Sequence, residues 1–284
     1  MAQFAYVVAA SENYLPGLKA LLKSMEMVGS EADVVIVAFQ MPDILARLLV
    51  DRYAFPVSVI HVDGDNQVHG TAIERFQVAG AMDEFYDAIC LLDADMFLTA
   101  DPSLFFEIAA AGFIVGGSNG MIVDFNRAYQ EVYGCFLGVD TYPFAKIHTT
   151  APLFVGPRDL DWFRALYDSR RVDSWDDFLY LNLLGIKMGK SDRLLVMPPY
   201  TFTGIHHWGV KPETSWREKA GLFLSGTEEQ VYMVHGKWWD EGWRSDLMLV
   251  MDRYFADETM GEKCRQRCLD AIESAYARFQ ELSE

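Results

Sequence analysis

Two aspartates, Asp93 and Asp95, stand two residues apart near the end of an apolar run that begins at Ala88. A short apolar run of this kind is typical of a strand covered on both faces. Open α/β sheets bind their ligands at the carboxyl ends of such strands. Two carboxylates in so apolar a setting cost free energy unless a cation or hydrogen bonds offset their charge. The pair therefore predicts a divalent metal site at the end of a buried strand.

Acid-rich chains produce Asp-x-Asp patterns by chance, and this sequence has two others, at 63–65 and 159–161. Gly64 favours a plain turn at the first of them. Only Asp93 and Asp95 follow a long apolar strand preceded by three predicted strand and helix units, where a ligand site is expected. A helix cap or a turn is the alternative role for this pair.

Apolar periodicity predicts an alternating order of strands and helices in the first half of the chain. Strands and helices are expected in turn at 4–10, 16–28, 33–39, 43–53, 57–62 and 71–85, followed by the strand that starts at 88. Later elements are expected at 102–111 (helix), 113–115 and 147–155 (strands), 159–167 and 176–184 (helices) and 246–282 (helical tail). This order predicts an α/β fold with a mostly parallel central sheet flanked by helices, and an elaborated C-terminal part that ends in helices.

Composition and charge narrow the class of protein. The chain has 284 residues and a formal charge of −17, which argues against a protein that holds nucleic acid by neutralising phosphates. No apolar segment approaches the roughly 20 residues that a membrane span needs, and 4–10 is too short for a signal peptide. The four cysteines show no C-x-x-C spacing, which favours reduced thiols. We expect a soluble cytoplasmic protein.

Three segments carry a resemblance to a known family. The loop AASENY at 9–14 follows the first strand, IERF at 73–76 lies just ahead of the metal strand, and LLDADMFL occupies 91–98. In type, order and spacing they resemble the nucleotide-diphospho-sugar glycosyltransferases of the GT-A fold. The resemblance is closest to glycosyltransferase family 8, the glycogenin and galactosyltransferase group, and it extends to about residue 243.

The resemblance implies a single Rossmann-like GT-A domain over residues 1–245. Its nucleotide-binding half would cover about 1–120 and its acceptor half about 121–245, with 246–284 as a helical tail packed on it. By resemblance, Asp95 is the bidentate metal ligand, Asp93 is shared between the metal and the donor's ribose or sugar, and Tyr14 stacks on the base. The positions implied to bind the donor are Ala9, Ser11, Asn13, Tyr14, Arg75, Asp93, Ala94 and Lys237, with Lys211 as the alternative to Lys237.

Family 8 proteins also carry a late His-x-x-Gly-x-x-Lys-Pro-Trp motif, whose histidine completes the metal site and whose lysine meets the diphosphate. The segment 206–212 keeps His206, Gly and Lys-Pro but is one residue short. The segment 235–238 is shorter still, yet it follows a clear strand and falls where the family's motif usually falls. We therefore expect His235 as the third metal ligand, with His206 as the alternative.

The sequence departs from the family at the positions that touch sugar and acceptor. Thr150 lies where the family has Asn-Ser-Gly, and the stretch 177–182 keeps only the first Asp and the final Leu-Asn of the family's Asp-Gln-Asp-x-Leu-Asn. Asp177 is the remaining candidate for the reaction centre, with helix capping as its alternative role. By its place in the resemblance, Thr150 is expected to face the sugar or the acceptor. Since flat aromatic faces suit sugar rings, Trp208, Trp238 and Trp239 are expected to do the same, although a lid or small core is the alternative for the tryptophans.

A hard cation with carboxylate and imidazole ligands suits Mn²⁺ or Mg²⁺. The sequence thus predicts a metal-dependent glycosyltransferase that moves a sugar from a nucleoside-diphosphate donor, UDP-linked by resemblance, to the hydroxyl of a carbohydrate or other acceptor. If the resemblance extends to mechanism, the anomeric configuration is retained. Nucleic acid and a membrane span are not expected.

Two other interpretations of the sequence stay open. A strand that ends in Asp-x-Asp also opens the haloacid-dehalogenase-like phosphatases, where Asp93 would be a nucleophile. Those proteins usually have Thr or Val where this chain has Phe97, and their motif lies near the start of the α/β core. The second alternative is a GT-A domain that binds nucleotide sugar without transferring it, which the departures at 149–151 and 177–182 allow.

Overall fold

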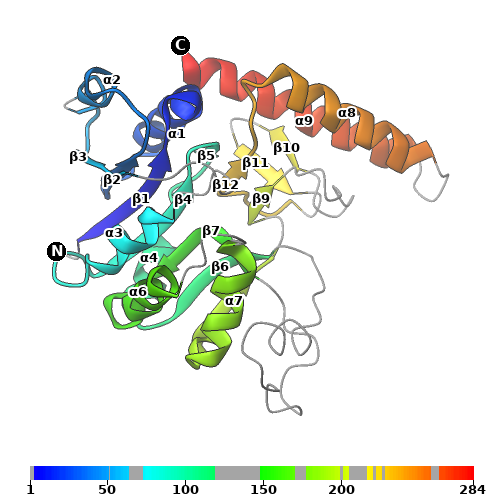
Figure 1. Cartoon of the computed structure of the whole chain (residues 1–284). Helices are drawn as coiled ribbons and strands as arrows, with labels where there is room; N and C mark the ends of the chain where they lie inside the picture. The colour runs from blue at the N-terminus through cyan, green and yellow to red at the C-terminus, as the bar shows by residue number, and fades with distance from the viewer. Residues whose placement is uncertain are drawn as a thin grey trace.

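The computed structural model of the protein describes residues 3–50, 52–63, 73–118, 148–169, 177–198, 201–204, 216–219, 222–225, 228–256 and 262–284. A central sheet lies between helices, and two long C-terminal helices run along one side of the molecule (Figure 1). Within the described ranges, no helix combines the length and the apolar character that crossing a membrane requires.

The central sheet has seven strands in the order β3-β2-β1-β4-β7-β6-β8. In chain order they are β1 (Phe4–Ala10), β2 (Asp33–Ala38), β3 (Val57–His61), β4 (Ala88–Asp93), β6 (Ile114–Ser118), β7 (His148–Val155) and β8 (Leu194–Met197). Strands β3, β2, β1 and β4 pair in parallel, and so do β6 and β8, whereas β7 runs antiparallel to β4 and β6. The predicted mostly parallel sheet is therefore confirmed.

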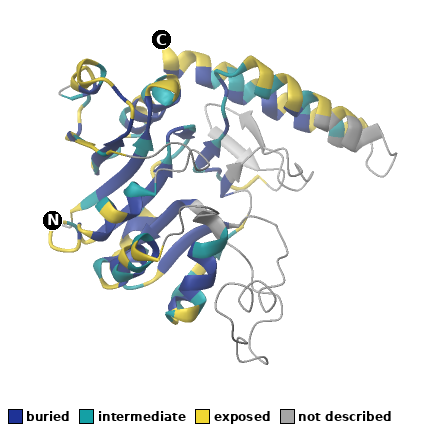
Figure 2. Ribbon diagram, viewed as in Figure 1, coloured by how far each residue is buried: buried dark blue, intermediate teal, exposed yellow. Residues whose placement is uncertain are grey.

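Strand β1 is buried on both faces, as its continuous apolar sequence predicts. Tyr6 and Val8 pack into one hydrophobic cluster, and Ala5 and Val7 pack into another. Successive side chains of a strand point to opposite faces, so an unbroken apolar run fills both clusters at once. Figure 2 shows the resulting buried centre of the molecule in dark blue.

Helices cover both faces of this sheet. The cluster that contains Tyr6 and Val8 takes side chains from α1 (Leu15–Met27), α2 (Asp43–Arg47) and α4 (Ser103–Ala110). The cluster that contains Ala5 and Val7 takes side chains from α3 (Glu74–Gly80), α6 (Leu160–Asp168) and α7 (Asp177–Lys187). The described residues of this part of the fold also include three short 3₁₀ turns, η1 (Glu12–Tyr14), η2 (Pro157–Asp159) and η3 (Lys190–Arg193).

Helices α2 and α3 are shorter than their sequence pattern predicts. In α2 only Ala46 is buried, while Ile44 is 70% exposed, so little core contact stabilises a longer helix. Helix α3 ends at Gly80, where a Cβ would lie 2.7 Å from Cγ of Arg164 in α6. The missing side chain at Gly80 therefore lets α6 pack closely on the end of α3.

A second, three-stranded sheet was not expected from the sequence. Its order is β5 (Met96–Leu98), β12 (Met233–His235) and β9 (Phe202–Gly204), and β12 runs antiparallel to β5 and parallel to β9. Met96 and Met233 join the cluster of the central sheet, whereas Phe97 and Val234 join a third cluster. The small sheet is thus packed on both faces. A separate hairpin pairs β10 (Trp216–Lys219) with β11 (Leu222–Ser225).

The predicted helical tail consists of two helices, α8 (Glu241–Ala256) and α9 (Glu262–Ser283). Helix α8 begins earlier than expected because Asp240 caps it, accepting a hydrogen bond of 2.9 Å from the backbone N–H of Trp243. Buried residues of α9, among them Ile272 and Phe279, form the third cluster together with Phe97 of β5. The two helices lie side by side with their outer faces exposed (Figures 1 and 2).

Candidate metal centre

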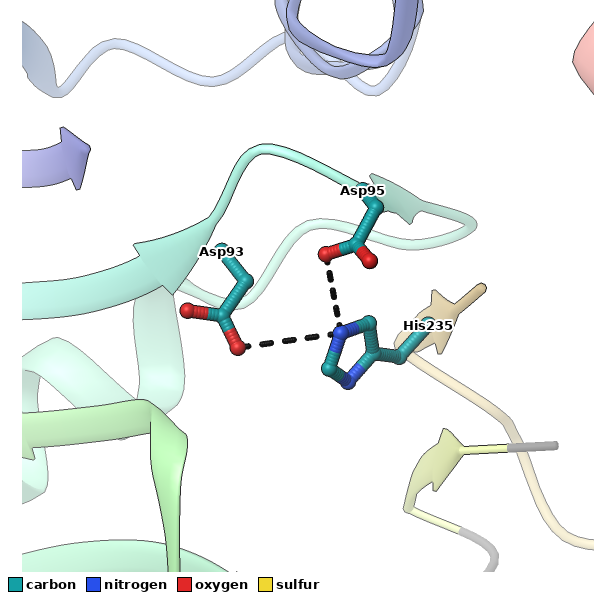
Figure 3. A group of neighbouring side chains, drawn as sticks. All are labelled: Asp93, Asp95 and His235. Carbon is teal, nitrogen blue, oxygen red and sulfur yellow. Dashed lines mark hydrogen bonds and ion pairs between the residues drawn. The ribbon is translucent and has the colours of Figure 1, made fainter. Parts of the chain in front are cut away.

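The structure brings Asp93, Asp95 and His235 together at the junction of the two sheets (Figure 3). Asp93 ends β4, Asp95 lies in the turn that leads into β5, and His235 ends β12. The register of β12 against β5 pairs His235 with Met96, which places its ring beside Asp95. Nε2 of His235 lies 2.9 Å from Oδ1 of Asp95 and 3.6 Å from Oδ2 of Asp93. The backbone reinforces the junction, because the N–H of Gly236 donates to the carbonyl of Asp95 at 2.8 Å.

The electrostatics of this group favour positive charge at its centre. The side chains of Asp93, Asp95 and His235 are 27%, 17% and 16% exposed, so water screens them only partly. Burial alone would lower the pKa of His235, but the carboxylates of Asp95 and Asp93 outweigh it and raise the pKa to about 9. The two carboxylates that attract this proton would equally attract a metal cation.

The donor set fits a divalent cation. The three ligand atoms lie within 4.8 Å of one another. An octahedral ion with bonds of about 2.1 Å holds neighbouring ligand atoms about 3 Å apart and opposite ones about 4.2 Å apart. The distances of 2.9 Å and 3.6 Å from Nε2 of His235 to the two carboxylates are near this spacing, so small side-chain movements suffice. Two carboxylates and one imidazole could therefore hold Mn²⁺ or Mg²⁺.

Arg75 lies on the other side of Asp93. Its side chain is buried, and its Nη1 donates to Oδ1 of Asp93. Asp93 thus has one oxygen against Arg75 and the other facing His235. The guanidinium also lies 5.1 Å from the ring centre of Phe76. These contacts fix the orientation of the Asp93 carboxylate, which is what a metal ligand requires.

The loop after β1 lies at the same edge of the sheet. Ala9 pairs directly with Asp93 across the parallel strands, and Ser11 is buried one residue beyond the strand end. Asn13 is exposed and Tyr14 is half-buried in η1. Burial and the nearby carboxylates of Asp95, Asp93 and Asp240 raise the pKa of Tyr14 to about 12.

Lys237 and Trp239 approach this loop from the far end of the chain. Nζ of Lys237 lies 5.0 Å from the ring centre of Tyr14, a cation–π contact. The ring centre of Trp239 lies 5.6 Å from that of Tyr14, with the rings at 76°. The structure therefore places Lys237, predicted from the late motif, next to the predicted nucleotide loop.

The remaining predicted residues lie elsewhere or outside the described part of the chain. Trp238 is 1% exposed and packs edge-on against Trp243 in the third cluster, so it is a core residue and we do not retain it as sugar-facing. Thr150 lies on β7 and Asp177 begins α7, but their side chains are not among those described. His206, Trp208 and Lys211, the alternatives of the other histidine segment, lie outside the described residues.

Gly17 is a site residue that the sequence pattern did not single out. A Cβ at this position would lie 2.4 Å from Cζ3 of Trp239 and 2.5 Å from the carbonyl oxygen of Ala94. The first turn of α1 therefore packs directly on the turn that carries the two aspartates. Its sequence signal is a glycine immediately after Pro16 in a helix that has no other glycine.

Replacing Gly17 with alanine is expected to lower the free energy of unfolding by about 1–3 kcal/mol, because the new methyl group forces backbone atoms apart. Urea denaturation measures the loss. Gly242→Ala in α8 is the matched control, because its Cβ would meet only Oδ1 of Asp240, at 3.3 Å. We expect that control to stay within about 0.5 kcal/mol of the wild type. Equal stability of Gly17→Ala and the wild type would contradict the close packing of α1 on Ala94.

Three solved structures of similar fold are glycosyltransferases. No family model matches the chain, and no curated protein matches it. Among solved structures, the galactosyltransferase LgtC in complex with donor and acceptor sugar analogues is 14% identical, with a TM-score of 0.53 over 93% of this chain and 99% of that one. The chain has the fold of this glycosyltransferase.

Two further structures agree with this result. An active-site mutant of LgtC, in which a glutamine is replaced by glutamate, is 13% identical, with a TM-score of 0.56 over 93% of this chain and 99% of that one. The bifunctional glycosyltransferase WbbM is 13% identical, with a TM-score of 0.53 over 89% of this chain. The chain spans about half of WbbM, 52% of its length. The predicted GT-A fold is thus confirmed, with its mostly parallel sheet and its C-terminal helices.

Proposed function

We propose that the protein is a metal-dependent glycosyltransferase that moves a sugar from a nucleoside-diphosphate donor, UDP-linked, to an acceptor hydroxyl with retention of the anomeric configuration. One observation carries the proposal: Asp93, Asp95 and His235 converge at the carboxyl end of β4 in a fold shared with glycosyltransferase structures. This is the sheet edge at which open α/β folds bind their ligands.

In the proposed reaction, the bond between the anomeric carbon and the diphosphate breaks and a bond to the acceptor oxygen forms, while the proton of the acceptor hydroxyl passes to the leaving diphosphate or to water. When bound, Mn²⁺ or Mg²⁺ would stabilise the negative charge that develops on the leaving nucleoside diphosphate. Asp95 and His235 would hold the ion from the turn before β5 and from β12. Asp93 would share it from β4, oriented by the contact of its second oxygen with Arg75.

The positive side chains near this group would help to hold an anionic donor. The chain as a whole carries a formal charge of −17, which repels the negatively charged diphosphate of a donor. Local positive charge at the site is therefore needed to bind it. Lys237, half-buried beside the ring of Tyr14, is the cation that we assign to the diphosphate. Ala9, Ser11, Asn13 and Ala94 would line the nucleotide loop and the metal turn. Asp177 stays a proposal for the reaction centre, and Thr150 stays a proposal for a residue that faces the sugar or the acceptor.

Removing the metal is expected to abolish turnover. We expect one donor of a panel of nucleoside-diphosphate sugars to release its nucleoside diphosphate with Mn²⁺ present, and release to stop with EDTA and return with excess Mn²⁺ or Mg²⁺. The reason is that loss of several kcal/mol of charge stabilisation slows the chemical step by orders of magnitude. A coupled assay for nucleoside diphosphate measures this directly.

The same panel separates the other two functions. Thermal stabilisation by UDP with Mn²⁺, without release from any donor, would indicate a binding domain that does not transfer sugar. Hydrolysis of a generic phosphoester that is lost in Asp93→Asn, with no response to nucleotide sugars, would indicate a phosphatase. Release that continues unchanged in EDTA would contradict the metal-dependent mechanism.

A further inference from the structure

A chain of aromatic contacts joins the last helix of the protein to the nucleotide loop. The ring centre of Phe279, on α9, lies 5.9 Å from that of Trp239. Trp239 in turn lies 5.6 Å from Tyr14 at 76°, and Nζ of Lys237 lies 5.0 Å from the centre of the Tyr14 ring. Contacts of this kind favour defined ring orientations in addition to burying apolar surface. Four side chains from three distant parts of the sequence thus form one connected group.

The ring of Trp239 is held between three segments of backbone and side chain. On one side, Gly17 lets the ring approach α1 so closely that a Cβ would lie 2.4 Å from its Cζ3 and 2.6 Å from its Cη2. The carbonyl oxygen of Ala94, in the turn between the two aspartates, would lie 2.5 Å from the same Cβ. Phe279 packs on Trp239 from α9. A ring held in this way has few alternative positions. Its contact with Tyr14 therefore also restricts the orientation of the Tyr14 ring.

Helix α9 is itself fixed to the strands that carry the metal residues. Phe279 is 5% exposed and Ile272 is fully buried. Both belong to the cluster that also contains Phe97 of β5 and Val234 of β12. Asp95 immediately precedes β5 and His235 ends β12. The helix therefore supports one face of the small sheet and, through Phe279, the tryptophan beside the nucleotide loop.

We propose that Trp239 and Phe279 are positioning residues that hold Tyr14 and Lys237 in place for the donor, which makes α9 part of the nucleotide-binding machinery. The inference rests on the proposed function. The side chain of Lys237 has several rotatable bonds and that of Tyr14 has fewer, and a donor that had to order both would bind more weakly. With Trp239 seated against Gly17 and Phe279, that ordering is complete before the donor arrives.

The test uses the full chain and titrates UDP in the presence of Mn²⁺ by calorimetry. We expect Phe279→Ala and Trp239→Ala to weaken UDP binding by roughly tenfold, the size expected when two side chains must be ordered on binding. Trp239→Phe and Phe279→Leu keep most of the apolar volume, so they destabilise the fold less than the alanine variants do. We expect them to weaken UDP binding by roughly two- to fivefold. In an active preparation, the donor KM should rise by the same factors while kcat changes little.

Phe55→Ala is the matched control for a merely structural role. It truncates a side chain of the same type and the same 5% exposure as Phe279, but in the loop before β3 and in the cluster of the central sheet. We expect it to lower the melting temperature as Phe279→Ala does, but to leave the affinity for UDP within about twofold of the wild type. Restored affinity in Phe279→Leu relative to Phe279→Ala would further support the positioning role.

Two outcomes would overturn the proposal, and they are distinguishable. If the wild type binds UDP and Phe279→Ala and Trp239→Ala bind it as well as the wild type does, or if Phe55→Ala weakens binding as much as Phe279→Ala does, the positioning role is wrong while the proposed function stands. If the wild type binds no nucleoside diphosphate with Mn²⁺ or Mg²⁺, both the proposed function and the positioning role are wrong.

Discussion

Asp95→Asn is expected to slow release of nucleoside diphosphate by about a thousandfold or more at saturating donor. The substitution keeps the size of the side chain but removes the charge that faces His235 at 2.9 Å. Loss of metal stabilisation worth about 4 kcal/mol in the transition state corresponds to about three powers of ten in rate. The measurement is the rate of release with Mn²⁺ present, together with the affinity for Mn²⁺ of the variant and the wild type.

Asp63→Asn is the matched control for this prediction. Asp63 also stands just after a parallel strand, β3, and begins another Asp-x-Asp pattern, but it is exposed and outside the group of candidate ligands. We expect its variant to retain the rate of the wild type within about twofold. A fully active Asp95→Asn variant, or equal losses in Asp95→Asn and Asp63→Asn, would remove Asp95 from the mechanism.

Asp93 could be predicted from the sequence because its position depends on local pattern. The apolar run of β4 decides that the strand is buried, and parallel order decides at which edge it ends. The structure agrees with this, because Ala9, near the end of β1, pairs with Asp93 at the end of β4. For this reason the fold class, Asp93 and Asp95 could be predicted from the sequence alone.

His235 could be placed only as one of two alternatives, because its partner lies 140 residues away. No local pattern shows that β5 leaves the central sheet to pair with β12. Trp238 and Trp239 illustrate the same limit. They are neighbours of one residue type, yet the first is 1% exposed in the core and the second packs on Tyr14 and Phe279. Tertiary packing alone separates them, since adjacent side chains in a turn have no fixed period.

Asp159 begins one of the Asp-x-Asp patterns that acid-rich sequences contain by chance. In the structure it is the centre of a buried cluster of ion pairs. Its carboxylate is fully buried, 0% exposed, and accepts hydrogen bonds from Lys190 at 3.0 Å and from Nη1 of Arg193 at 2.6 Å. Arg193 also donates to the carbonyl of Gly112 at 2.9 Å. The cluster joins the start of α6 to η3 and to the turn before β6, so Asp159 offsets the charge of two cations at a junction of three segments.

Asp159→Ala is expected to lower the free energy of unfolding by about 3–5 kcal/mol, because removing the buried carboxylate leaves Arg193 and Lys190 without their buried counter-charge. Chemical denaturation at about pH 7 measures this. Asp161→Ala is the matched control: Asp161 lies 2.7 Å from the same Lys190, but its side chain is 49% exposed. We expect that control to cost about 0–1 kcal/mol. Similar losses in the two variants would show that burial does not determine the strength of this cluster.

The effect of Asp159 should also depend on pH in a defined direction. Burial alone would raise the pKa of Asp159, but the hydrogen bonds from Arg193 and Lys190 outweigh it and hold the pKa below its ordinary value. A group whose pKa is lower in the folded state stabilises the fold fully above its unfolded pKa, about 3.9, and loses that contribution as the pH falls through its folded pKa. The difference in unfolding free energy between wild type and Asp159→Asn should therefore be constant from about pH 7 to about pH 5 and shrink below about pH 4. A difference that persists unchanged to about pH 3 would mean that the carboxylate contributes through packing and not through its charge.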